Sequence, residues 1–160
     1  GITPLLWALE RYRNMENLSV KGISAGILAT LVLSIPVGIM FSYFFIEIYN
    51  DVAPGVNFAN EEEADAMADK MMYHPLSIAF LVLATFITVG FPAYISALVA
   101  NKGYTLNSVS IGVFALLVSF LNYELIARYP KLFVFLAVFT LFVAYLSGLL
   151  RRRQVMKNEV

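Results

Sequence analysis

One short segment combines soft sulfur ligands with the only histidine of the chain. Met67, Met71 and Met72 precede His74 in an acidic stretch, and Met67 and Met71 share a helix face because they are four residues apart. Thioethers and an imidazole are ligands that Cu(I) prefers. The segment therefore suggests extracytoplasmic copper handling, although the same methionines would also form the apolar stripe of an amphipathic helix. No other cofactor is indicated.

Two carboxylates beside long apolar runs are the other candidates for chemistry. Glu47 and Glu124 both stand next to aromatic residues near the ends of such runs. Tyrosine favours the membrane–water interface, so both acids are expected at one depth near a membrane surface. There they would line an ion or solute vestibule, face Arg128, or converge with His74 in a lipid-directed enzyme site. Solvated interfacial acids are the simpler interpretation.

Most catalytic classes lack their residues in this chain. The sequence has no cysteine and a single histidine, which removes thiol chemistry and two-histidine metal sites within one chain. It has neither a dinucleotide-binding nor a Walker-type glycine loop. No ionisable residue lies deep in an apolar run, which argues against a proton-coupled pump working alone. The expected function is non-enzymatic, with no nucleic-acid partner.

Four uncharged runs define the architecture that would position these residues. They extend over residues 23–46, 76–100, 106–123 and 132–150, and each is 18 to 25 residues long. About 20 apolar residues cross a hydrocarbon core of roughly 30 Å. The sequence therefore predicts an all-α integral membrane protein, a single membrane domain forming an up-down bundle of four transmembrane helices. The predicted spans are about 23–49, 76–100, 106–126 and 131–150.

The basic residues are sorted between the two sides of the predicted bundle. Eight of the eleven Lys and Arg residues fall on the side of the termini: Arg11, Arg13, Lys21, Lys102, Arg151, Arg152, Arg153 and Lys157. The positive-inside rule then predicts a multi-pass protein of the plasma (inner) membrane with both termini cytoplasmic. Residues 1–14 are either a native interfacial anchor or an extension ahead of a start at Met15.

The segment 50–75 is the only sizeable connection and is predicted to lie outside the cell. Asn60 with Glu63 resembles a capped helix start, and residues 61–72 carry apolar side chains at helical spacing. Pro75 is expected to end this short amphipathic helix. Pro36 is expected to kink the first span, and Gly90 with Pro92 the second.

Small residues recur every fourth position along the first span. The row consists of Gly22, Gly26, Thr30, Ser34, Gly38 and Ser42. Because lipid tails are as apolar as leucine, such rows drive helix association by close packing. Besides the lipid bilayer, the expected partners are therefore other membrane subunits or further copies of this chain. The leading hypothesis is a subunit or homo-oligomer that acts by helix–helix association. The alternative is a small-solute or cation transporter or channel.

Overall fold

The computed structural model describes residues 17–56 and 59–158, and every regular element within that part of the chain is helical. Four helical segments are long and apolar enough to cross a membrane: Val20–Val52, Pro75–Ala100, Tyr104–Arg128 and Pro130–Asn158. The predicted fold class, a four-helix membrane bundle with a short helix in one connection, is confirmed. The alternatives for residues 1–14 lie outside the described residues.

The first span is the single helix α2 (Val20–Val52), and the connecting helix α3 covers Glu61–Met72. The second span consists of α4 (Pro75–Thr85), a π-helical turn η1 (Phe86–Gly90) and α5 (Phe91–Ala100). The third consists of α6 (Tyr104–Ser119), a 3₁₀ turn η2 (Phe120–Asn122) and α7 (Tyr123–Arg128), and the fourth is α8 (Pro130–Asn158).

Local sequence signals explain where the helices begin. Asn60 caps α3 by accepting a hydrogen bond from the Glu62 N–H, and its amide donates to the Glu63 carboxylate. Pro75 opens α4 at a position where its missing N–H has no helical partner to lose. Asn101 and Gly103 adopt left-handed backbone conformations, which allows the tight turn between α5 and α6.

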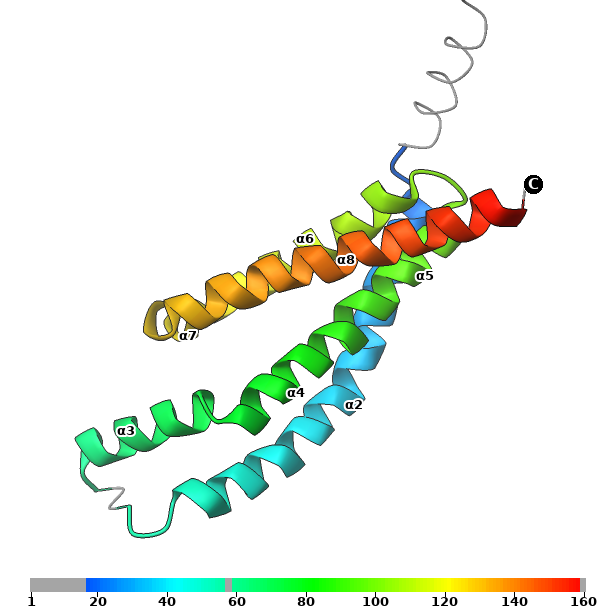
Figure 1. Ribbon diagram of the computed structural model, residues 1–160. Coiled ribbons are helices and arrows are strands. Elements are labelled where there is room, and N and C mark those ends of the chain that lie inside the picture. Colours follow the sequence, from blue (N-terminus) through cyan, green and yellow to red (C-terminus); the bar gives the residue numbers. More distant parts are fainter. Residues whose placement is uncertain (1–16, 57–58, 159–160) are drawn as a thin grey trace, which may run out of the picture.

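The four spans form two antiparallel pairs that meet at one end of the molecule and diverge toward the other (Figure 1). One pair is α2 with α4 and α5, and the other is α6 with α8. The pairs meet where α2 begins and α8 ends, which we call the terminal end. They separate toward the opposite end, where α3 lies, which we call the α3 end.

The second span changes its helical winding just before Pro92. The Phe91 N–H donates to the Phe86 carbonyl five residues back, which is the π-helical pattern. Proline has no N–H to donate to the carbonyl four residues earlier, so the backbone adjusts at this point. The irregularity predicted for this span is therefore a π turn, and the carbonyl of Gly90, its last residue, accepts a hydrogen bond from Ser147 Oγ at 2.9 Å.

Candidate functional site

A buried asparagine ties three parts of the chain together at the terminal end. The Asn107 side chain is fully buried, and its Oδ1 accepts a hydrogen bond from the Ser19 backbone N–H at 2.8 Å. Its Nδ2 lies within hydrogen-bonding distance of the carbonyls of Asn17 (3.2 Å), Lys102 (3.1 Å) and Gly103 (2.8 Å). The start of α2, the α5–α6 turn and α6 are therefore held in one polar cluster.

Glycines bring the helices of the terminal half into backbone contact. A Cβ added at Gly26 would lie 2.5 Å from Ile111 Cδ1, and one at Gly22 would lie 2.7 Å from the Ser96 carbonyl oxygen. On the other pair, a Cβ at Gly148 would lie 2.6 Å from the Thr105 Cα. No side chain fits at these positions without displacement, so this half of the bundle is closed by close packing.

Serine hydroxyls reinforce this packing with bonds between spans. Ser108 Oγ donates to the Ala93 carbonyl at 2.8 Å, and Ser96 Oγ donates to the Asn107 carbonyl at 3.2 Å. Both serines are fully buried. Interhelical hydrogen bonds of this kind hold membrane helices together where burial alone gives no driving force. Sequence reasoning missed this cluster, although polar residues in apolar runs at 96, 107 and 108 were a usable signal.

A cavity of about 300 Å³ lies where the two pairs begin to separate, and all four spans contribute to it. Six hydroxyl-bearing residues line it: Thr30, Ser34, Thr85, Thr88, Ser119 and Thr140. The other lining residues are apolar: Leu31, Val89, Phe114, Ala115, Val118 and Leu136. They lie between six and fourteen residues from the nearer end of their spans, about 9–21 Å along the helix axes. The cavity therefore lies between the inner parts of the four apolar spans, away from their ends.

The lining becomes more exposed toward the α3 end on each span. On α2 the exposure rises from the half-buried Thr30 to the exposed Ser34, and on α6 from the half-buried Phe114 to the exposed Ser119. The buried members, Val89 and Thr140, lie on the side of the terminal end of their spans. The cavity is thus closed toward the terminal end and open toward the α3 end.

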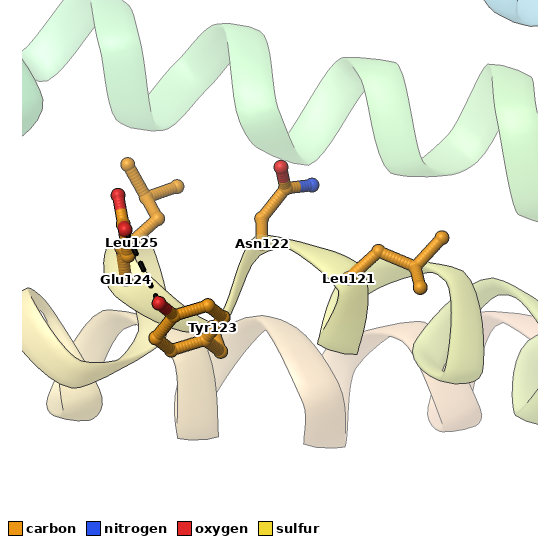
Figure 2. Close-up of a pocket in the computed structure, with 5 residues that line it drawn as sticks. All are labelled: Leu121, Asn122, Tyr123, Glu124 and Leu125. Carbon is orange, nitrogen blue, oxygen red and sulfur yellow. Dashed lines mark hydrogen bonds between the residues drawn. The ribbon is translucent and has the colours of Figure 1, made fainter.

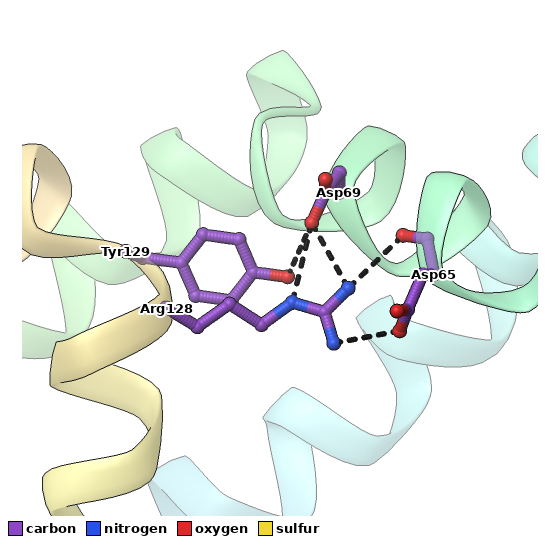
Figure 3. Close-up of polar contacts among 4 residues, drawn as sticks. All are labelled: Asp65, Asp69, Arg128 and Tyr129. Carbon is purple, nitrogen blue, oxygen red and sulfur yellow. Dashed lines mark hydrogen bonds and ion pairs between the residues drawn. The ribbon is translucent and has the colours of Figure 1, made fainter. Parts of the chain in front are cut away.

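An ion-pair cluster joins α3 to the start of α8 at the α3 end (Figure 3). Arg128 Nη1 lies 2.8 Å from Asp65 Oδ1, and Arg128 Nη2 lies 3.2 Å from Asp69 Oδ1. The Tyr129 hydroxyl donates to the same Asp69 oxygen at 2.8 Å. We call these four residues the α3 clasp. The clasp links the connection between spans one and two to the connection between spans three and four.

Tyr129 is the one member of the clasp that is buried. Burial raises the pKa of the Tyr129 phenol above its ordinary value, and the hydrogen bond that it donates to Asp69 raises it further. Its ring packs edge-on against Tyr73, with 5.9 Å between the ring centroids. The phenol therefore stays neutral over the physiological pH range and acts as a hydrogen-bond donor in the clasp.

The two predicted vestibule acids are exposed and lie in different parts of the α3 end. Glu124 accepts a hydrogen bond from the Tyr123 hydroxyl at 3.3 Å, and Figure 2 shows its side chain with Asn122 on the side facing away from α8. Glu47 lies near the end of α2, on the other helix pair. Within the described chain no hydrogen bond or ion pair joins Glu47 to Glu124, and Arg128 contacts Asp65 and Asp69 instead. The vestibule stays a prediction.

The predicted copper ligands lie together in sequence around the end of α3. Met71 is buried, and Met67 and Met72 are half-buried. His74 caps α4: its Nδ1 accepts from the Leu76 N–H, and its Nε2 lies 3.3 Å from Asp51 Oδ2. Because both ring nitrogens are engaged, Cu(I) binding would have to displace one of these bonds. The copper hypothesis remains untested.

The row of small residues on α2 has two different environments. Gly22 packs inside the chain against the second span and Gly26 against the second and third spans, whereas Gly38 has no atom near the position of an added Cβ. Ser34 and Ser42 are exposed, and their hydroxyls donate to carbonyls of their own helix. The row therefore packs internally at the terminal end and is open over its second half.

No protein-family model matches the chain, and neither the curated proteins nor the solved structures include one with significant similarity to it. The class of protein thus follows from the fold. The four apolar helices define a multi-pass membrane protein in contact with the lipid bilayer.

Proposed function

We propose that this protein acts by associating with other membrane-spanning helices, as a subunit of a membrane complex or as a homo-oligomer. The supporting observation is the open half of α2. Between Gly26 and Ile48 no residue of this helix is buried within the chain. Beyond Ser34, which lines the cavity, Gly38 and Ser42 continue the row that α2 already uses for close packing at Gly22 and Gly26. A second helix that contacts this face would approach the backbone as closely as α5 approaches Gly22.

The absence of cysteine from the chain permits a direct test with single-cysteine variants. In native membranes, Gly38→Cys should form a disulfide-linked dimer under mild oxidation if a second copy covers this face. Met40→Cys is the matched control, because Met40 is exposed on the far side of the same turn of α2. If a different subunit covers this face, a photoreactive residue at position 38 should crosslink to it and give one adduct of defined mass. Products that are equally abundant from positions 38 and 40, or absent from both, would contradict the proposal.

We also propose that the terminal end faces the cytoplasm of a plasma or inner membrane. The supporting observation is the bias of Lys and Arg toward Lys21, Lys102 and the tail after Leu150. In intact cells an impermeant thiol reagent should label Lys70→Cys on α3 and spare Lys157→Cys at the end of α8. The reverse labelling pattern would invert the assigned orientation.

Transport of a small solute is the second candidate function, and the cavity favours it. A chamber between the inner parts of the spans that is closed at one end and open at the other has the form of one state of an alternating-access carrier. Reconstituted protein should then carry a solute into liposomes. If the two acids form a vestibule, Glu47→Gln and Glu124→Gln should reduce the flux. If the cavity carries the solute, Thr88→Val should reduce it. An absence of flux for ions and for neutral solutes would rule out transport.

A further inference from the structure

We infer that the cavity between the four spans binds a small uncharged amphiphile whose polar end donates hydrogen bonds, such as a phenol or an alcohol. The inference names a ligand class for the cavity of the transport candidate, but it requires only binding and no transport.

The charge of the ligand follows from the lining residues. None of the twelve is ionisable. A charged group near the middle of a bilayer is costly without an opposite charge to pair with it. An ion would therefore remain uncompensated in this cavity, and a neutral molecule would not carry that cost.

The hydrogen-bonding state of the hydroxyls determines which polar group fits. Five of the six donate their proton to a carbonyl of their own helix: Thr30, Ser34, Thr85, Thr88 and Ser119. A hydroxyl that has donated its proton in this way keeps its lone pairs as acceptors. The cavity thus presents mainly acceptors, and its ligand must supply donors.

Thr140 differs from the other hydroxyl residues of the cavity. It is 7% exposed, and no hydrogen bond joins its hydroxyl to another described residue. Its hydroxyl oxygen is accessible from the cavity, since Arg151 Nε is the one fully buried side-chain nitrogen or oxygen without a partner in the described chain. The unpaired hydroxyl can therefore both donate a hydrogen bond to a ligand and accept one from it. The hydroxyl group of a bound ligand can therefore form a hydrogen bond with the Thr140 hydroxyl, which has no partner among the described residues.

The apolar lining residues and the volume of the cavity indicate that the ligand is a small amphiphile. Half of the lining residues are apolar, including Val89, Phe114 and Leu136, so an apolar body would replace water favourably. A volume of about 300 Å³ lies at the lower end for small-molecule sites. The exposure of Ser34 and Ser119 places the entrance toward the α3 end.

A matched pair of probes tests the donor requirement. Resorcinol and 1,3-dimethoxybenzene share a ring, and only resorcinol donates hydrogen bonds. With the protein in nanodiscs and empty nanodiscs as the blank, calorimetry should show saturable resorcinol binding. Dimethoxybenzene lacks both hydroxyl donors and should bind at least about three- to tenfold more weakly, which is the effect of losing one neutral hydrogen bond. Equal affinities for the two probes, or no resorcinol signal above the blank, would overturn the inference.

Two variants locate the site. Thr88→Val preserves the side-chain shape and should weaken resorcinol binding about three- to tenfold. Ser42→Ala is the control, because the Ser42 hydroxyl also bonds to its own helix but lies outside the cavity. Unchanged affinity in Thr88→Val, or an equal loss in both variants, would remove the cavity as the binding site.

Thiol protection supplies an independent measurement. Thr88→Cys should react with a small neutral thiol reagent, and resorcinol should slow that reaction, while Ser42→Cys should react at the same rate with and without resorcinol. A lack of protection at position 88 would contradict the inference even if every variant folds. Protection and binding without any solute flux would instead eliminate transport and leave the site in place.

Discussion

The carboxamide oxygen of Asn107 lies 2.8 Å from the backbone nitrogen of Ser19, although 88 residues separate them in the chain. This contact joins the start of the first span to the third span at the terminal end. The same side chain also reaches the α5–α6 turn through the Gly103 carbonyl. A single buried amide thus fixes the end of the bundle from which the two helix pairs diverge.

Replacing Asn107 by Leu should destabilise the protein by about 2 kcal/mol or more. The change leaves the Ser19 N–H and the carbonyls of Asn17 and Lys102 without their partner in a partly buried region. Thermal or denaturant unfolding in detergent measures the loss. Ser110→Ala is the control, since the exposed Ser110 hydroxyl bonds only to the Leu106 carbonyl of its own helix, and it should change stability by less than about 0.5 kcal/mol. Equal effects of the two variants would contradict the assigned role of Asn107.

The two halves of the small-residue row should respond oppositely to added bulk. Gly26→Leu should destabilise the fold by about 1–3 kcal/mol or more, because its side chain would collide with Ile111 and Ser96. Gly38→Leu should leave the unfolding temperature of the isolated chain unchanged, since the space around Gly38 is open. Under the proposed association, Gly38→Leu should reduce the fraction of assembled protein. Loss of monomer stability in Gly38→Leu would show that the face packs within the chain.

The α3 clasp should hold α3 against the start of α8 in a salt-dependent manner. Arg128→Gln removes both ion pairs, and amide hydrogen exchange in residues 61–72 should become faster. Both ion pairs are substantially exposed and therefore contribute little to stability, and high salt should reproduce part of the effect on exchange. Lys131→Gln should leave the exchange of α3 unchanged. Identical exchange in the wild type and in Arg128→Gln would show that the clasp does not hold α3.

Alkaline pH should weaken the clasp through Tyr129. Its pKa is raised in the folded protein, so the neutral phenol contributes stability that is complete below the ordinary tyrosine pKa of about 10. That contribution should be lost as the pH rises through the folded-state pKa. The protection of the α3 amides, measured relative to the intrinsic exchange rate at each pH, should therefore fall above about pH 10 in the wild type. Tyr129→Phe should lack this alkaline step, and a step of the same size in that variant would assign the effect to another group.

The fold was predictable because membrane insertion depends on the length and hydrophobicity of each segment, and both can be read directly from the sequence. Uninterrupted apolar length predicts a span, and the Asn60–Glu63 spacing with Pro75 predicts α3 with the bounds that the structure has. The spans themselves run further than the uncharged stretches. Helix α8, for example, continues past Leu150 through the basic residues to Asn158, because a helix satisfies its own backbone beyond the hydrocarbon core as well.

The candidate site was not predictable from the same signals. Thr30, Thr88, Ser119 and Thr140 come from four different spans, and only helix packing brings them to one cavity. The two pairs meet where Gly26 lies against Ile111 and Gly90 against Val143, and this pairing of residues from different spans is not visible in the sequence. Likewise, the sequence suggests Glu47 or Glu124 as the partner of Arg128. In the structure its partners are Asp65 and Asp69, because α3 lies beside the connection between α7 and α8.

The native mass of the protein, extracted in mild detergent from its own membrane, tests the central claim most directly. A chain that works by helix association should migrate well above its monomer mass of 17.8 kDa after correction for detergent, as a homo-oligomer or together with other chains. Gly38→Leu should shift it toward the monomer, while Met40→Phe should not. A wild-type protein that is monomeric and fully active in isolation would contradict the account.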